Sequence, residues 1–472
     1  MVGVHAGKFT AERRTANLAA ACLRLGVHHP VVNDRQFRTW RAYAVRAWPT
    51  VTFVDPRGRV VAQQAGEVPL EALVEFTGRL VESHAKDGSL VRGPFALARE
   101  PAEPPTGLLR HPGKVLASDD GRLFVADSGH DRVLELRIDA GAAATAPHAG
   151  GAESASGGAA ARGAPRARLV RAFGSGEAGF EDGPASEARF REPQGMALVG
   201  DSLFVADRAN HAVRRVDLAT GRVETVAGTG TLGGAMRAGP ALRTDLRSPW
   251  DVCAAGPEGA PASGEAARHP GGAAGAGTLF VAMAGAHQIW RLDPASGRIH
   301  PHAGSGAEEI HDGPLAEAAL AQPSALAIAD GRIWFADSET SAVRWADLDP
   351  VGRVGTLVGT GLFDFGDRDG SGDEARLQHC LGVTWHGGGL FVADTYNGKL
   401  KRVDPASRAC VTWADGPAGA EAGRGSPLHE PGGISAGAGA LWVADTGHHR
   451  IVRYDPASAR GQVVELHETG AT

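Results

Sequence analysis

Cysteine, methionine and aromatic residues are scarce in this chain, and neither sign of charge predominates. There are four cysteines and four methionines among 472 residues, and Phe, Trp and Tyr together make up 6%. The four thiols form no C-x-x-C pair, which excludes a disulfide-stabilised secreted fold and a zinc site with the usual ligand spacing. With 48 basic and 54 acidic residues the net charge is −6, so the chain lacks the basic surface that nucleic-acid binding needs.

Long apolar runs and targeting features are also missing. No stretch approaches the ~20 apolar residues of a membrane-spanning helix, and no polybasic patch is present to bind anionic lipid. Residues 1–30 lack the basic flank, apolar run and cleavage site of a signal peptide. We therefore expect a cytoplasmic, monomeric protein with no membrane or nucleic-acid partner.

Glycine, by contrast, is abundant. It accounts for 66 of 472 residues, about twice its usual share, while the hydrophobic content of 43% is sufficient for a packed core. Such a composition favours many short elements joined by tight turns over a mostly helical protein.

A sixfold repeat is the strongest signal in the sequence. Each copy has an apolar strand that ends in a small residue and usually Asp: LFVADSGHDRV (123–133), LFVADRANHAV (203–213), LFVAMAGAHQI (279–289), IWFADSETSAV (333–343), LFVADTYNGKL (390–400) and LWVADTGHHRI (441–451). In five copies a strand that begins with proline precedes it, and Cys380 takes the proline position in the fifth copy. Four short strands per copy and six copies predict a mostly β protein, a six-bladed β-propeller.

The remaining segments differ from this repeat. Residues 1–90 alternate short apolar strands with amphipathic helices, which predicts an α/β domain, and residues 91–106 are expected to be a linker to a propeller that spans 107–472. Two Ala/Gly-rich insertions, 140–167 and 256–277, lack bulky apolar residues, so we expect them to be disordered surface loops.

These strings resemble a known family. LFVADTGHHRI (441–451) with its upstream EPGG resembles the NHL repeat. VGVHAGKF (2–9), HPVVNDRQFRTWRAYAVRAWPTVTFVDPRGRVV (29–61) and DGPASEARFREPQG (182–195) are similar to the NHL-repeat-containing protein 2-like family. The resemblance covers nearly the whole chain and implies a thioredoxin-like domain followed by an NHL propeller. In that family the thioredoxin-like domain begins earlier, with the cysteine motif, so the resemblance implies an N-terminally truncated, partial domain.

The resemblance also implies one substrate-binding loop. Trp48, Pro49 and Thr50 match the cis-proline loop, which in thioredoxins faces the redox cysteines and accepts substrate backbone. Cys22 does not match the redox position. Reactive thiols need a lowered pKa and a resolving partner, and we therefore interpret the four isolated cysteines as unreactive.

Two sets of aspartates recur with the repeat. Asp127, Asp207, Asp337, Asp394 and Asp445 end the apolar strands and could form a ring of acids, but we interpret them as structural residues that bond the N–H groups of the next turn. Asp182, Asp312 and Asp369 each lie 11 residues before the Pro or Cys of the inner strand. The third lies in DRDGSGD (367–373), which resembles a calcium loop. Since the position recurs, we favour a structural role and expect no metal.

Three functions fit these observations. The first is a non-catalytic protein-interaction scaffold with a protein partner, no catalytic residues and no cofactor. The second is a thiol–disulfide oxidoreductase whose redox-active half is missing from this chain. A third is a hydrolase or lyase that uses the central pocket of the propeller. As the chain stands, with its redox motif absent, we do not expect an enzyme.

Overall fold

The computed structural model describes residues 1–66, 68–93, 107–139, 164–234, 237–256, 277–417 and 427–468. It divides into two compact units, Met1–Pro104 and Pro105–Thr472. Among the helices in these ranges, none combines the length and the apolar character needed to cross a membrane.

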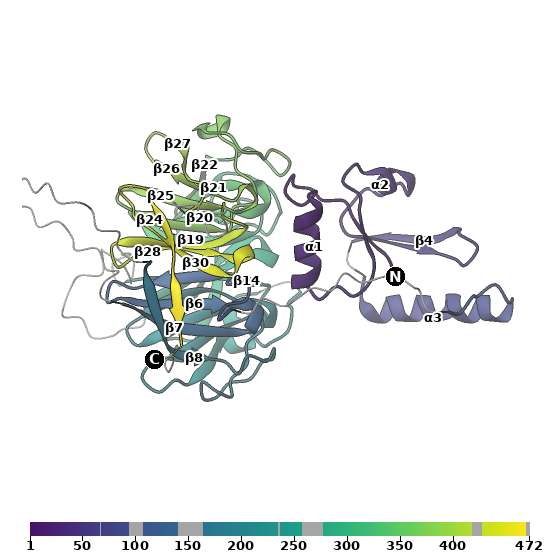
Figure 1. Cartoon of the computed structure of the whole chain (residues 1–472), viewed down its shortest axis with the longest axis horizontal. Coiled ribbons are helices and arrows are strands. Elements are labelled where there is room, and N and C mark those ends of the chain that lie inside the picture. Colours follow the sequence, from purple (N-terminus) through teal and green to yellow (C-terminus); the bar gives the residue numbers. More distant parts are fainter. Residues whose placement is uncertain are drawn as a thin grey trace, which may run out of the picture. The chain divides into compact units, whose positions relative to one another are not determined.

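The N-terminal unit contains the strands and helices expected from the sequence, in the expected order. They are β1 (Gly3–His5), α1 (Thr15–Arg24), β2 (Val31–Asn33), α2 (Arg38–Ala42), β3 (Thr50–Val54), β4 (Val60–Ala65) and α3 (Leu70–Lys86) (Figure 1). Strand β1 pairs in parallel with β2, and β3 pairs antiparallel with β4. Because these four strands form two separate sheets, the thioredoxin-like assignment of this unit stays a hypothesis.

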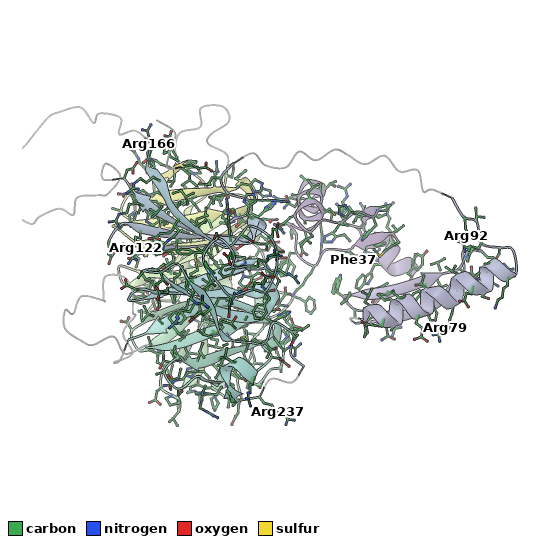
Figure 2. All side chains as sticks on the ribbon, turned by 90° about the horizontal axis from the view of Figure 1, so that it is seen from below. Phe37, Arg79, Arg92, Arg122, Arg166 and Arg237 are labelled. Atoms are coloured by element: carbon green, nitrogen blue, oxygen red, sulfur yellow. The ribbon has the colours of Figure 1, made fainter. Side chains whose placement is uncertain are left out.

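The core of the N-terminal unit is small. Its fully buried apolar side chains, within the described residues, are Ala6, Phe9 and Ala11. Helix α3 packs on β3 through Phe76 and Phe53, whose ring centroids lie 4.3 Å apart. Arg79 lies on the exposed side of α3 (Figure 2). With so little apolar area removed from water, this unit has a weak hydrophobic stabilisation.

The described strands of the second unit form six blades, which confirms the six-bladed propeller. From the inner to the outer strand, blade 1 contains β5 (Lys114–Ala117), β6 (Arg122–Asp127), β7 (Arg132–Ile138) and β8 (Arg166–Phe173). Blade 2 contains β9 (Pro193–Val199), β10 (Ser202–Asp207), β11 (Ala212–Asp217) and β12 (Val223–Ala227). Blade 3 contains β14 (Pro249–Ala255), β15 (Thr278–Met283), β16 (Gln288–Asp293) and β17 (Arg298–Ala303).

Blades 4 to 6 repeat this order. Blade 4 contains β19 (Pro323–Ala329), β20 (Arg332–Asp337), β21 (Ala342–Asp347) and β22 (Arg353–Val358). Blade 5 contains β24 (Gly382–His386), β25 (Gly389–Asp394), β26 (Lys399–Val403) and β27 (Ala409–Ala414). Blade 6 contains β28 (Pro431–Gly437), β29 (Ala440–Asp445), β30 (Arg450–Tyr454) and β31 (Gly461–Val463). The inner strands touch in the closed order β5–β9–β14–β19–β24–β28–β5 around a central channel.

The LFVAD-type strands are buried along their whole length because neighbouring blades cover both faces of each sheet. In blade 2, for example, Leu203 and Val205 pack toward blade 1, whereas Phe204 packs toward blade 3. Successive side chains of a strand point to opposite faces, so a strand between two apolar neighbours must be apolar at every position.

A fifth, outer strand covers the edge of four blades. In blades 3, 4 and 5 it is a two-residue strand of the segment that leads into the same blade: β13 (Gly239–Pro240), β18 (Gly313–Pro314) and β23 (Gly370–Ser371). In blade 1 the C-terminal strand β32 (Glu465–His467) takes this place and pairs in parallel with β8 (Figure 1, yellow beside blue-teal). The two ends of the propeller sequence therefore meet in blade 1.

The first insertion predicted from the sequence is shorter than expected. Arg166 and Ala167, assigned to a loop at 140–167, belong to β8, and Ala167 is fully buried between blades 1 and 6. The alternation of polar and apolar residues in RARLVRAF is hard to recognise in the sequence, because one of the buried positions is the small residue Ala167. Residues 140–163 and 257–276, like linker residues 94–106, lie outside the described residues.

Candidate functional site

The five strand-ending aspartates are buried and serve the fold. All five have no exposed area, and in each the Oδ1 atom accepts the backbone N–H of the residue two positions before the inner-strand Pro or Cys of the same blade. The donors are Arg110, Arg191, Ala321, Gln378 and His429, at 2.7–2.8 Å from Asp127, Asp207, Asp337, Asp394 and Asp445. The donors thus lie in the preceding loop, whereas the sequence interpretation placed them in the next turn.

In blades 2 and 4 the second carboxylate oxygen pairs with a buried arginine. Arg214 Nη1 lies 2.8 Å from Asp207 Oδ2, and Arg214 Nη2 lies 2.7 Å from Asp182 Oδ1. Arg344 repeats both contacts with Asp337 and Asp312, at 2.8 and 3.0 Å. The recurring aspartate before each inner strand is therefore half of a clamp that holds the leading segment against its own blade.

In blade 5 a lysine replaces the arginine. The buried Lys401 Nζ lies 2.8 Å from both Asp367 and Asp369, the two acids that resembled the start of a calcium loop. Asn397 Nδ2 donates to Asp394 Oδ2 at 2.7 Å. These contacts give the carboxylates a cation that belongs to the chain itself, and within the described residues no group of His, Cys, Asp and Glu is arranged to hold a metal ion.

Burial dominates the acidity of these groups. It raises the pKa of Asp207 to about 6 and that of Asp394 to about 7, and it raises the pKa of Asp337, with hydrogen bonds and the nearby cations opposing it. Asp207 and Asp337 each have an arginine at contact distance, and Asp394 accepts from Gln378 N and Asn397 Nδ2, so the oxygens of these carboxylates are already bound by groups of the chain.

A second repeated contact joins adjacent blades. In blades 1, 2, 4 and 6 the residue four positions after the strand-ending Asp accepts the N–H that precedes the next inner strand: Asp131 from Glu192, His211 from Ser248, Ser341 from His379 and His449 from His111, at 2.8–3.1 Å. Both partners of each bond have φ between 47° and 56°. Sequence reasoning missed this ring of bonds because none of these residues is glycine, the usual signal of left-handed backbone.

The inner strands surround a cavity of about 800 Å³ at one end of the channel. Residues of all six inner strands line it. The hairpin tips 119–121 of blade 1, 386–388 of blade 5 and 438–440 of blade 6 line it as well. Each tip joins an inner strand to the next strand, so these loops form the rim. A cavity of this size falls in the range of ligand sites.

Two charged residues stand out among the lining side chains. Counted from the inner-strand Pro or Cys, the second following position is Lys114, Gly195, Asp251, Ala325, Gly382 and Gly433 in blades 1 to 6. Lys114 and Asp251 are 5% and 9% exposed. Lys114 Nζ donates to the backbone carbonyl of Ser324, at 3.0 Å, and to that of Leu381. Because these acceptors belong to blades 4 and 5, the lysine spans the channel from blade 1.

Asp251 binds backbone N–H groups. Its Oδ1 accepts from Val252 at 2.9 Å and its Oδ2 accepts from Leu326 of blade 4 at 2.8 Å. Hydroxyls do the same elsewhere: Ser435 accepts from Ala117 and Thr384 from Ala436, at 3.0 and 3.2 Å. Each donor lies on the edge of an inner strand, where no further strand pairs with it, so these side chains satisfy otherwise unpaired edges.

Burial opposes the charge of both groups at the channel. It lowers the pKa of Lys114 to about 8 and raises the pKa of Asp251 to about 6, while the attraction between the two opposes both shifts. Neither Lys114 nor Asp251 was predicted as a site residue. An alignment of the six inner strands on their first Pro or Cys shows these two charged residues at a position that is otherwise Gly or Ala.

The loop predicted as a substrate groove lies in the N-terminal unit. The Trp48–Pro49 peptide bond is cis, and Thr50 Oγ1 donates to Ala47 O at 2.7 Å. Trp48 is 48% exposed, and its indole N–H donates to Ala6 O at 2.8 Å. Trp40 and Phe37 pack against it, with ring centroids at 4.5 and 6.4 Å, and Phe37 lies beside α2 (Figure 2). The loop therefore presents an aromatic surface.

The cysteines lie apart from this loop in sequence and are free thiols. Cys22 lies in α1, and Cys253, Cys380 and Cys410 lie in the propeller. Burial raises the pKa of the Cys253 and Cys380 thiols well above the usual range and that of Cys410 to about 12. A thiol kept protonated is a poor nucleophile, which agrees with the interpretation of these three cysteines as packing residues.

Comparisons with known proteins identify relatives over almost the whole chain. NHL repeat-containing protein 2 from Bos taurus is 34% identical over 96% of this chain and 61% of its own length. Protein SUPPRESSOR OF QUENCHING 1, chloroplastic, from Arabidopsis thaliana is 34% identical over 96% of this chain and 41% of its own length. The chain thus spans about three fifths or less of these relatives. No family model matches it.

Among solved structures, a virginiamycin B lyase from Staphylococcus aureus is similar. The structure of its catalytically inactive variant has a TM-score of 0.41 and 13% identity, over 75% of this chain and 84% of the lyase. At this level the likeness carries no argument about function.

Proposed function

Since this chain is an NHL-repeat protein, related to NHL repeat-containing protein 2 along 96% of its length, we propose that it is a non-catalytic protein-interaction scaffold. Its propeller binds a protein partner at the end of the channel that carries the hairpin tips. The cavity lined by all six inner strands carries this proposal, because concave surfaces in a rigid framework are where binding groups concentrate.

The other end of the channel, where the strand-ending aspartates lie, supports the placing of the partner at the hairpin tips. There the aspartates and arginines pair within their own blades, and separate hydrogen bonds join adjacent blades, so these groups stabilise the framework. The rim differs, since Asp119, Asp120, Gly387 and Gly388 are exposed and available to a partner.

Site-specific photo-crosslinking of the full chain tests the scaffold. Benzoylphenylalanine at Asp119 or at Gly388 is expected to crosslink one defined protein in a cell extract. Benzoylphenylalanine at Arg191, equally exposed but in the loop that leads into β9, is the matched control and is expected to give no such product. The same products from all three positions, or none from the rim, would contradict the proposal.

The N-terminal unit supplies a second contact in this proposal. Trp48, Pro49 and Thr50, with Trp40 behind them, form an exposed aromatic loop suited to an extended segment of a partner. In this proposal the N-terminal unit is a partial, vestigial thioredoxin-like domain. Trp48→Ala is expected to lower the yield of the crosslinked product, and Trp345→Ala in blade 4 is the control for loss of an aromatic ring.

The alternative function is thiol–disulfide exchange. It requires a redox-active cysteine pair, which this sequence does not contain, and Cys22, the cysteine outside the propeller, does not match the redox position. Reduction of insulin by the full chain in dithiothreitol, above the rate of a variant with all four cysteines replaced by alanine, would establish this alternative. We expect equal rates.

A further inference from the structure

The channel contains a buried cation whose hydrogen-bond partners are neutral backbone carbonyls. Lys114 donates to two backbone carbonyls, those of Ser324 and Leu381. A lysine ammonium has three N–H donors, so one is left after these contacts. Among the described residues no carboxylate lies within 4.0 Å of its Nζ. Lys401, the other fully buried lysine, has two such carboxylates, each at 2.8 Å, and the contrast marks Lys114 as a cation without a counter-ion at contact distance.

Asp251 is not in contact with that ammonium. It attracts Lys114 electrostatically, but its two oxygens accept the N–H groups of Val252 and Leu326. Asp251 is therefore a charge partner without a hydrogen bond to Lys114, and the third N–H of Lys114 is left for another acceptor.

The channel is shaped around the lysine. Gly382 and Gly433 occupy the positions of blades 5 and 6 that correspond to Lys114. A Cβ atom on Gly433 would lie 2.9 Å from Lys114 Cα and 3.0 Å from Lys114 Cδ, whereas one on Gly382 would meet Ala393 Cβ at 2.9 Å and the Gly433 backbone at 3.2 Å. Gly433 therefore leaves room for the lysine, and Gly382 allows blades 5 and 6 to approach closely.

The cavity next to Lys114 has apolar walls. Leu116, Met196, Leu326, Ile328 and Ile434 line it together with Lys114. Three acids line the cavity as well, Asp251 beside the inner strands and Asp119 and Asp120 at the rim. Apolar walls with a small number of convergent polar groups are typical of sites that orient a small molecule by its polar end. A carboxylate forms short, charge-assisted hydrogen bonds with an ammonium, and it would add a charge partner in contact with Lys114 to the attraction that Asp251 provides.

We propose that the central cavity binds a small apolar molecule with a carboxylate group, and that Lys114 receives the carboxylate at the floor of the cavity. This site goes beyond the scaffold function and does not depend on a protein partner. The carboxylate takes the third N–H of the ammonium, and the apolar part of the ligand lies along Leu326, Ile328 and Ile434.

The probe for the test is 4-phenylbutyrate, with 4-phenylbutyramide as its neutral match, because the two share a carbon skeleton and differ in the charge that Lys114 recognises. Binding of each to the full chain is measured by isothermal titration calorimetry at pH 7. We expect the acid to bind at least tenfold more tightly than the amide. Equal affinities, or no binding of the acid at millimolar concentration, would overturn the proposal, and this comparison needs no variant.

Three variants locate the site. Lys114→Met keeps the length of the side chain and is expected to reduce acid binding at least tenfold while leaving amide binding unchanged. Ala327→Trp fills the cavity and is expected to abolish binding of both probes. Lys399→Met removes a surface lysine that pairs with Asp367 and is expected to change neither. Acid binding that survives Lys114→Met would show that the carboxylate binds elsewhere and would refute the assignment.

Discussion

Arg214 and Asp207 form an ion pair at 2.8 Å in which neither side chain has any exposed area. Arg214 also bonds the backbone carbonyls of Arg189 and Glu181, and its guanidinium lies about 5 Å from the ring centres of Phe180 and Phe190. In blade 3 the corresponding residues are Met283 and Trp290, and Ala238 stands in the place of Asp182. The propeller thus contains both a buried ionic pair and an apolar replacement of the same pair.

This natural replacement predicts the result of a double substitution. Arg214→Met is expected to lower the free energy of unfolding by about 3–5 kcal/mol, because it leaves the Asp207 carboxylate buried without its cation. Asp207→Met together with Arg214→Met is expected to cost less than Arg214→Met alone, since the second change removes that carboxylate. Guanidinium unfolding of the single and double variants measures the difference.

The control for this pair is Arg208→Met. Arg208 pairs with Glu192 at a partly exposed site, where an ion pair contributes about 0–1 kcal/mol, so a small effect is expected. A double variant less stable than both singles would show that the apolar pair of blade 3 does not transfer to blade 2.

Strand β32 is expected to hold blade 1 closed. Leu466 packs in the cluster shared by blades 1 and 6, so Leu466→Asp places a charge against apolar surface and detaches the strand from β8. Hydrogen exchange of the full chain is expected to accelerate in β7 and β8 and to stay unchanged in β16 of blade 3. His467→Ala, a change at a half-exposed position of the same strand, is the control. Unchanged protection of β8 in the Asp variant would contradict a closing role.

The stability of blade 5 is expected to depend on the protonation of Asp394. Burial raises its pKa to about 7 from the ordinary value of 3.8, so between these values the folded state holds a proton that the unfolded state has released. Stability from this group is therefore present below pH 4 and falls by about 1.4 kcal/mol per pH unit up to pH 7.

Asp394→Asn removes this dependence. Relative to the unaltered chain, the variant is expected to gain stability steadily as the pH rises from 4 to 7, whatever its absolute stability. In the exposed turn after β26, backbone and side-chain bonds from Ser407 lower the pKa of Asp404. Because the Asp404 carboxyl is ionised in both the folded and the unfolded state above about pH 5, Asp404→Asn should leave the shape of the pH profile between pH 5 and 7 unchanged. Urea unfolding at pH 4, 5, 6 and 7 measures both, and parallel pH profiles for Asp394→Asn and the unaltered chain would refute the assignment.

The N-terminal unit is expected to exchange its amide hydrogens faster than the propeller. Its helices α1 and α2 contain no buried residue, whereas β10 and β20 are buried along nearly their whole length. Few buried contacts allow local opening at low free energy. Mass-spectrometric hydrogen exchange on the full chain, with peptides from β10 and β20 as references, tests this. Equal protection in both units would overturn it.

Much of the propeller could be predicted because its signals are local. The apolar LFVAD-type strands, the Asp that ends them and the proline of the inner strand recur at fixed spacing, so each blade is visible without the others. The aspartates were interpreted as structural, and their buried hydrogen bonds agree with that, while the interpretation of Cys253 and Cys380 as packing residues stays a prediction. The donors to the aspartates were misplaced because they lie 16 or 17 residues earlier in the chain. The left-handed backbone at His211 and His449 could not be predicted, because neither residue is a glycine.

The sequence by itself determined how many blades form and which residues end their strands. Both follow from the spacing of 14 or 15 residues between the inner-strand Pro or Cys and the strand-ending Asp, which recurs in five blades. Only the tertiary structure decided how the ring closes and what the channel contains. Strand β32 is three residues long and has no pattern of its own, and it pairs with β8 because blade 6 delivers it there. Lys114 contacts residues 210 and 267 positions away, and those contacts exist because six blades bring their inner strands around one axis.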